Sequence, residues 1–153
     1  MLSDVRCVFQ ASDPEQDVLR YSVTSGNDDE HFAIDASRIL LTGMSDGATY
    51  TFMLGLQSDT PFTHLAPVCG VLHPVVMMDG SLVNARHKPI YQVNGVVDWM
   101  FPIDSAYMAR DQLLEAGADL TFRAIEDLPH TYPRDENPHI LDWLGAPQAN
   151  RRS

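Results

Sequence analysis

The chain has 153 residues, of which 44% are hydrophobic and 20% are charged, a composition typical of one globular domain. Ten basic against 21 acidic side chains give a formal net charge of −11, which repels nucleic-acid phosphates and anionic lipid head groups. No apolar run approaches the roughly 18 residues of a membrane span. We therefore expect a single domain that has neither nucleic acid nor a membrane as its partner.

Residues 1–6 carry an acid early and lack a long apolar core, so the sequence predicts no secretory signal and a cytoplasmic location. Cys7 and Cys69 are too few for a disulfide framework, and neither has the spacing of metal ligands. We therefore expect free thiols, no metal site and no cofactor.

The first 36 residues carry only short structural signals. A possible cap followed by proline predicts a helix over 14–19, and residues 21–24 predict an extended segment. We assign 1–36 to a short amino-terminal segment that is exchanged between copies or covers a sheet edge. Residues 37–147 form the predicted core, and 148–153 a flexible tail.

Apolar runs alternate with helical patterns through the core. The predicted strands are 39–42, 64–72, 88–95 and 120–125, and the predicted helices are 46–56, 104–116 and a last one from 136 or 137 to 144. This alternation predicts an α/β fold, with a mainly parallel sheet flanked by helices and a ligand site beyond the carboxyl ends of the strands.

Hydrophobic spacing predicts which helix faces are buried. Tyr50, Met53 and Leu54 mark the buried face of the first core helix, and Leu114 belongs to an apolar stripe on the second. Residues 77–84 are predicted to be a connecting loop, with Met77 and Met78 as core or as the lining of an acyl pocket.

A Gly-x-Ser-x-Gly pattern, Gly43 to Gly47, joins the first core strand to the first core helix. This pattern is typical of a serine held in a sharp strand-to-helix turn with its Oγ exposed. Crowding in such a turn favours the absence of side chains at Gly43 and Gly47. Ser45 is therefore the candidate nucleophile.

A serine nucleophile needs an imidazole as base and a carboxylate that orients the imidazole. Asp98 follows the third strand and His130 follows the fourth, so the order is serine, aspartate, histidine, as in α/β-hydrolases. The alternatives are Asp104, which also suits the cap of a helix, and His139, which falls inside the last helix. We prefer Asp98 and His130 because both follow strand ends.

From Arg38 onward the chain resembles the carboxylesterase, phospholipase and dienelactone-hydrolase-like branch of the α/β-hydrolase superfamily. The resemblance rests on the segments IDASRILLTGMSDG (34–47), PIYQVNGVVDWMFP (89–102) and LPH (128–130). It implies a serine carboxylesterase acting on small, short-chain esters. Ser45 would be the nucleophile, Asp98 the triad acid and His130 the general base.

Members of that branch carry a longer segment before the nucleophile strand, with a His-Gly pair that supplies half of the oxyanion hole. This chain has 44 residues before Ser45 and no His-Gly or Gly-Gly pair among them. The resemblance therefore implies a minimal, truncated α/β-hydrolase fold that lacks the amino-terminal half. The one oxyanion donor that we can assign is the backbone N–H of Asp46.

Met44, Trp99 and Met100 adjoin the candidate catalytic residues and are the predicted lining of the substrate pocket. An uncovered edge of a parallel sheet favours association, so we expect a homo-oligomer, with a dimer favoured. The competing interpretation is a weak or inactive hydrolase domain that serves as a binding or assembly module.

Overall fold

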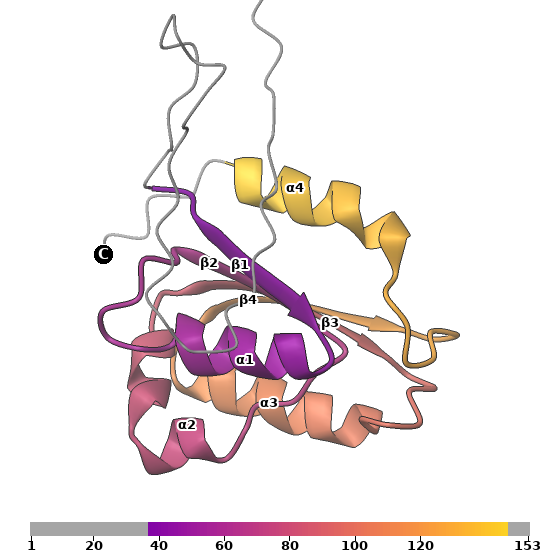
Figure 1. The fold of residues 1–153 in the computed structure, drawn as a ribbon, viewed down its shortest axis with the longest axis horizontal. Helices are drawn as coiled ribbons and strands as arrows, with labels where there is room; N and C mark the ends of the chain where they lie inside the picture. Colours follow the sequence, from indigo (N-terminus) through magenta and orange to yellow (C-terminus); the bar gives the residue numbers. More distant parts are fainter. Residues whose placement is uncertain (1–36, 147–153) are drawn as a thin grey trace, which may run out of the picture. The chain divides into compact units, whose positions relative to one another are not determined.

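The computed structural model describes residues 37–146, and the predictions for 1–36, Cys7 and 148–153 lie outside this range. Its four strands lie in one sheet in the order β1-β2-β3-β4 (Figure 1). They are β1 (Leu40–Met44), β2 (His64–Val68), β3 (Pro89–Gly95) and β4 (Asp119–Ile125). All neighbouring strands are parallel, which confirms the predicted mainly parallel sheet.

Helices cover both faces of the sheet. Figure 1 shows α1, α2 and α3 on one face and α4 on the other. The helices are α1 (Asp46–Gly55), α2 (Val75–Met78), α3 (Ile103–Glu115) and α4 (Asn137–Gly145), with short 3-10 helices η1 (Ser81–Ala85) and η2 (Arg134–Glu136). This arrangement confirms the predicted α/β class.

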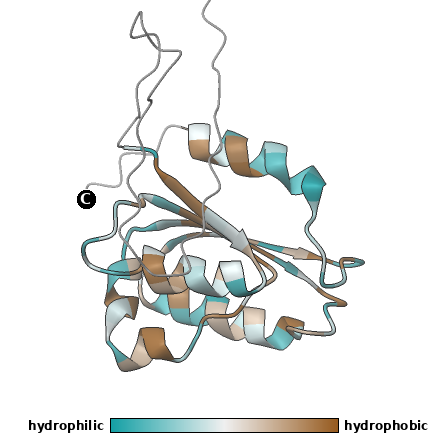
Figure 2. Cartoon of the chain, in the orientation of Figure 1, coloured by the Kyte–Doolittle hydropathy of each residue, from teal (hydrophilic) through white to brown (hydrophobic). Residues whose placement is uncertain are grey.

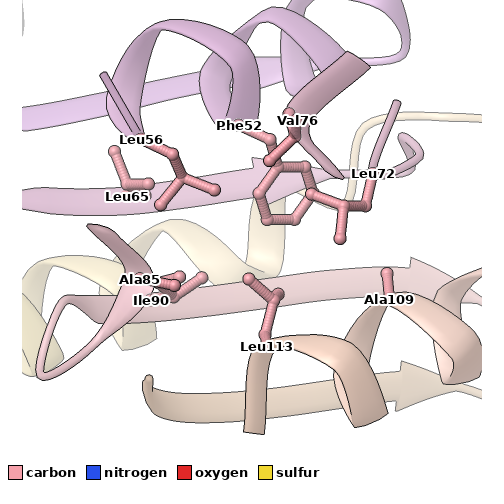
Figure 3. Packing of buried hydrophobic residues seen from close by; sticks show 9 residues of the cluster. All are labelled: Phe52, Leu56, Leu65, Leu72, Val76, Ala85, Ile90, Ala109 and Leu113. Carbon is pink, nitrogen blue, oxygen red and sulfur yellow. The ribbon is translucent and has the colours of Figure 1, made fainter. Parts of the chain in front are cut away.

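The core has one cluster of buried side chains on each face, because side chains alternate between the faces along a strand. On the side of α1 and α3, Leu65 and Ile90 pack with Phe52 and Leu113 (Figure 3). On the side of α4, the buried residues are Ala66, Val68, Cys69, Tyr91, Val93, Leu128 and Ile140. Strands β2 and β3 are buried on both faces and form the centre of the sheet.

The buried face of α1 differs from the prediction. Tyr50 and Leu54 are 55% and 52% exposed, whereas Ala48, Thr51, Phe52 and Gly55 face the core. Of the three predicted residues, Met53 alone packs against the core, where it is partly buried. Small residues let the helix lie close to β2, since a Cβ on Gly55 would collide with the Leu65 side chain. Figure 2 shows the strongly hydrophobic residues of α1 in its carboxyl-terminal half, so hydropathy alone did not indicate the face.

Several predicted boundaries and faces also change. Residues 77–84 contain the end of α2 and most of η1 rather than only a loop, and β2 ends at Val68 rather than at residue 72. Met77 and Met78 are 42% and 84% exposed, and Leu114 is 50% exposed, so none of them is a core residue. No helix within residues 37–146 has the length and apolar character needed to span a membrane.

Candidate active site

Ser45 lies between the end of β1 and the start of α1 in a strained turn, with φ 60° and ψ −121°. Residues with a side chain rarely adopt positive φ, so the turn needs support from its surroundings. The N–H of Ser45 donates to the carbonyl of Val68 at 3.0 Å, and its carbonyl accepts from the N–H groups of Ala48 and Thr49. These bonds hold the serine at the carboxyl edge of the sheet.

Crowding in this turn is confirmed at Gly43 but not at Gly47. A Cβ on Gly43 would lie 2.5 Å from the backbone carbonyl carbon of Gly47, whereas a Cβ on Gly47 would meet nothing within 4 Å. The prediction for Gly47 was therefore wrong. The close approach of β1 and α1 therefore requires a glycine at position 43 on the strand but not at position 47 on the helix.

The structure brings Ser45, Asp98 and His130 together. His130 Nε2 lies 2.9 Å from Ser45 Oγ, and His130 Nδ1 lies 2.8 Å from Asp98 Oδ2. The three residues follow the carboxyl ends of β1, β3 and β4, where the ends of parallel strands meet. The alternatives lie on other elements: Asp104 is exposed in the first turn of α3, and His139 is exposed on α4.

Both oxygens of the Asp98 carboxylate have partners. Oδ1 accepts hydrogen bonds from the N–H groups of Met100 and Phe101, at 2.8 and 2.9 Å. Burial would raise the pKa of Asp98, but the bonds from Phe101, His130 and Met100 outweigh burial and hold this pKa below its ordinary value. An ionised carboxylate only accepts hydrogen bonds, so the proton is assigned to His130 Nδ1 and Nε2 is free to accept from Ser45.

The predicted pocket residues occupy two different environments. Trp99 is 75% exposed and Met100 is 45% exposed, and the Trp99 ring approaches the imidazole of His130 with centroids 6.3 Å apart. Met44 is partly buried and packs against the core cluster on the α4 face. Trp99 therefore lies beside the candidate base, Met100 contacts Asp98 through its backbone N–H, and Met44 is the last residue of β1, next to Ser45.

Phe101 is a site residue that the sequence reasoning missed. Its ring lies 5.4 Å from the His130 ring, nearly edge to face. The signal was present in Asp98, because an aspartate often accepts hydrogen bonds from backbone N–H groups two or three residues later and so folds the chain back. This turn brings Phe101 against the imidazole.

The backbone N–H of Asp46 opens the first turn of α1. The first four N–H groups of an α-helix lack intrahelical acceptors, and the helix dipole favours negative charge at this end. This group can therefore face an oxyanion formed at Ser45. Within residues 37–146 we assign no second donor, and no group of three or more His, Cys, Asp or Glu residues there could hold a metal ion.

A parallel sheet with a serine at the strand-to-helix turn, followed in chain order by an aspartate and a histidine, defines the α/β-hydrolase class. The chain belongs to the phospholipase/carboxylesterase family, which it matches over residues 5–146. No match was found among curated protein sequences.

Solved structures with the same fold are distant in sequence. SOBER1 of Arabidopsis thaliana has a TM-score of 0.63 and 21% identity, over 73% of this chain and 54% of its own. Esterase PE8 has a TM-score of 0.61 and 20% identity, over 73% of this chain and 51% of its own. For Zea mays acyl-protein thioesterase 2 the values are 0.54 and 17%, over 68% and 53%. This chain spans about half the length of these structures, and the likeness shows the fold.

Proposed function

We propose that the protein is a serine esterase that cleaves small, short-chain carboxylic esters through an acyl-enzyme. The continuous hydrogen-bonded chain from Ser45 Oγ through His130 to Asp98 supports this proposal most strongly. Membership of the phospholipase/carboxylesterase family supports the same reaction class.

In the proposed reaction, Ser45 Oγ attacks the ester carbonyl while its proton passes to His130 Nε2. The Asp46 N–H stabilises the negative charge on the carbonyl oxygen, and Asp98 stabilises the imidazolium. When the bond to the alcohol breaks, His130 returns the proton to the departing oxygen. Water then repeats the sequence on the acyl-enzyme and releases the acid and free Ser45.

Hydrolysis of p-nitrophenyl acetate tests this proposal. Ser45→Ala removes the attacking oxygen, so kcat should fall at least about 10³-fold while the urea unfolding curve stays unchanged. Ser105→Ala is the matched control, because Ser105 lies on α3, outside the site, and its hydroxyl donates to the carbonyl of Pro102. Turnover by Ser45→Ala within tenfold of the wild type would refute the assignment.

The substrate site and the assembly are further parts of the proposal. Met44, Trp99 and Met100 would line the pocket for a small ester, with no metal or cofactor taking part.

Among the described residues β1 pairs only with β2. The outer edge of a strand has backbone groups that can pair with a strand of another copy. We therefore propose a homodimer, and the cytoplasmic location stays a prediction.

The second candidate function is a weak or inactive hydrolase domain that binds or assembles. The single oxyanion donor assigned in residues 37–146 favours it, since loss of one donor costs about 10²- to 10³-fold in rate. Labelling of Ser45 by a fluorophosphonate without measurable ester turnover would support this alternative over the esterase.

A further inference from the structure

The end of β2 lies between the serine turn and the loop that carries His130. Val68, the last residue of β2, accepts the hydrogen bond from the N–H of Ser45. Cys69 follows with φ 49°, in the left-handed region that few residues with a side chain adopt. The N–H of Cys69 donates to the carbonyl of Val93 at 2.8 Å, and this bond connects the bend at Cys69 with β3.

Cys69 supports the loop of the candidate base. Its side chain is fully buried, and Sγ donates a weak hydrogen bond to the carbonyl oxygen of Thr131 at 3.7 Å. Thr131 directly follows His130, and its own N–H donates to the carbonyl of Pro129 at 2.7 Å. The thiol therefore contacts the backbone next to the imidazole.

Gly70 supports the turn of the candidate nucleophile. A Cβ on Gly70 would lie 2.8 Å from the Ser45 carbonyl oxygen and 3.0 Å from the Thr49 nitrogen, and would collide with the Ala48 Cβ. The Gly70 carbonyl in turn accepts from Nδ2 of the buried Asn94 at 3.3 Å. The first turn of α1 can therefore approach the segment that follows β2 only because residue 70 has no side chain.

We propose that residues 68–70 act as a spacer that sets the distance between Ser45 Oγ and His130 Nε2, with Cys69 and Gly70 as positioning residues. Cys69 contacts the loop of the base, and Gly70 contacts the turn of the nucleophile. A change at either residue shifts one group relative to the other without removing either. Misplacement of reacting groups by about 1 Å can cost about 10²-fold in rate. This inference rests on the proposed esterase function.

The test uses the full chain with p-nitrophenyl acetate. Gly70→Ala should lower kcat by about 10- to 100-fold and Cys69→Ala by about threefold or more, with KM little changed, because both variants disturb alignment rather than binding. Cys69→Ser should restore kcat, since a hydroxyl can also donate to the Thr131 carbonyl. Adding Ala48→Gly to Gly70→Ala removes one of the collisions and should recover part of the loss.

A matched control separates positioning from general loss of stability. Val76→Ala truncates a fully buried residue of α2 in the cluster on the α1 and α3 face, whereas the Cys69 side chain belongs to the cluster on the α4 face, so this variant should keep the wild-type kcat. The proton NMR resonance of His130 Nδ1–H provides a readout independent of turnover. This resonance should shift or broaden in Cys69→Ala and stay unchanged in Val76→Ala.

Unchanged kcat in folded Cys69→Ala and Gly70→Ala would overturn the inference, as would a Cys69→Ser variant no better than Cys69→Ala. If Gly70→Ala does not fold, the kcat values of Cys69→Ala and Cys69→Ser alone test the inference. An inactive wild-type protein would refute the proposed esterase function instead. The His130 resonance would then still test whether the spacer positions the imidazole.

Discussion

At the scale of single residues, Asp98 connects the candidate base with the rim of the site. One carboxylate oxygen bonds His130, and the other accepts from the N–H groups of Met100 and Phe101. The same side chain therefore orients the imidazole and folds the loop that presents Trp99. The sequence predicted that Asp98 belongs to the site. It did not predict the bonds from the Met100 and Phe101 N–H groups, because these depend on a turn that only the structure shows.

We predict that Asp98 makes folding stability depend on pH in the acid range. Its pKa in the folded protein is lower than the value of about 3.9 for an exposed aspartate. Its stabilisation is therefore complete above about pH 4 and is lost as the pH falls through the folded-state pKa. Urea unfolding should show a free-energy gap between wild type and Asp98→Asn that narrows below about pH 4. A gap that stays constant from pH 6 to pH 3 would contradict this.

Trp99→Ala should raise the KM for aryl esters several-fold and leave kcat within about twofold, because the proposed contact of this ring is with bound substrate rather than with the reacting atoms. Its melting temperature should not change, since Trp99 is 75% exposed. Met78→Ala removes an 84% exposed side chain from α2 and serves as the control. An unchanged KM in Trp99→Ala would exclude this residue from the pocket.

At the scale of elements, the sequence predicted all four strands and the serine turn, because apolar runs and the glycine pattern are local signals. It did not predict α2, since four residues are too few to show helical periodicity. The predicted face of α1 was wrong for Tyr50 and Leu54, because the helix turns its small residues inward: Gly55 lies against Leu65 of β2, and Ala48 lies close to Gly70. Packing distance is a tertiary property that no periodicity shows.

A pair of truncations on α1 tests the corrected face. Phe52 is fully buried, so Phe52→Ala should lower the free energy of unfolding by about 3–5 kcal/mol. Leu54 is 52% exposed, and Leu54→Ala should cost less than about 0.5 kcal/mol. Urea denaturation measures both. Similar losses in the two variants would mean that Leu54 is buried in solution.

At the scale of the whole molecule, residues far apart in sequence meet because parallel strands end at one edge of the sheet. Ser45 and His130 are 85 residues apart, and Asp98 and His130 are 32 apart. Chain order and strand ends sufficed to predict this grouping. The roles of Cys69 and Gly70 could not be predicted from the sequence. Neither Cys69 nor Gly70 belongs to a recognisable motif, and the partner of the Cys69 thiol, Thr131, lies 62 residues away.

We predict that the chain forms a dimer through the outer edge of β1, which pairs only with β2 among residues 37–146. Static light scattering should give a mass near twice the 17.1 kDa of the chain. Thr42→Pro removes a backbone donor on β1, and proline is disfavoured within paired strands, so this change should favour the monomer. A mass near 17.1 kDa for the wild type would refute the dimer.

The most direct test of the central claim is labelling by a fluorophosphonate followed by peptide mapping. This reagent reacts with a serine whose oxygen is activated by a nearby base, so it tests Ser45, His130 and the strand-to-helix turn together. The account predicts one label per chain, on Ser45, and its loss in His130→Ala. A label on another residue, or no label on folded protein, would contradict the account.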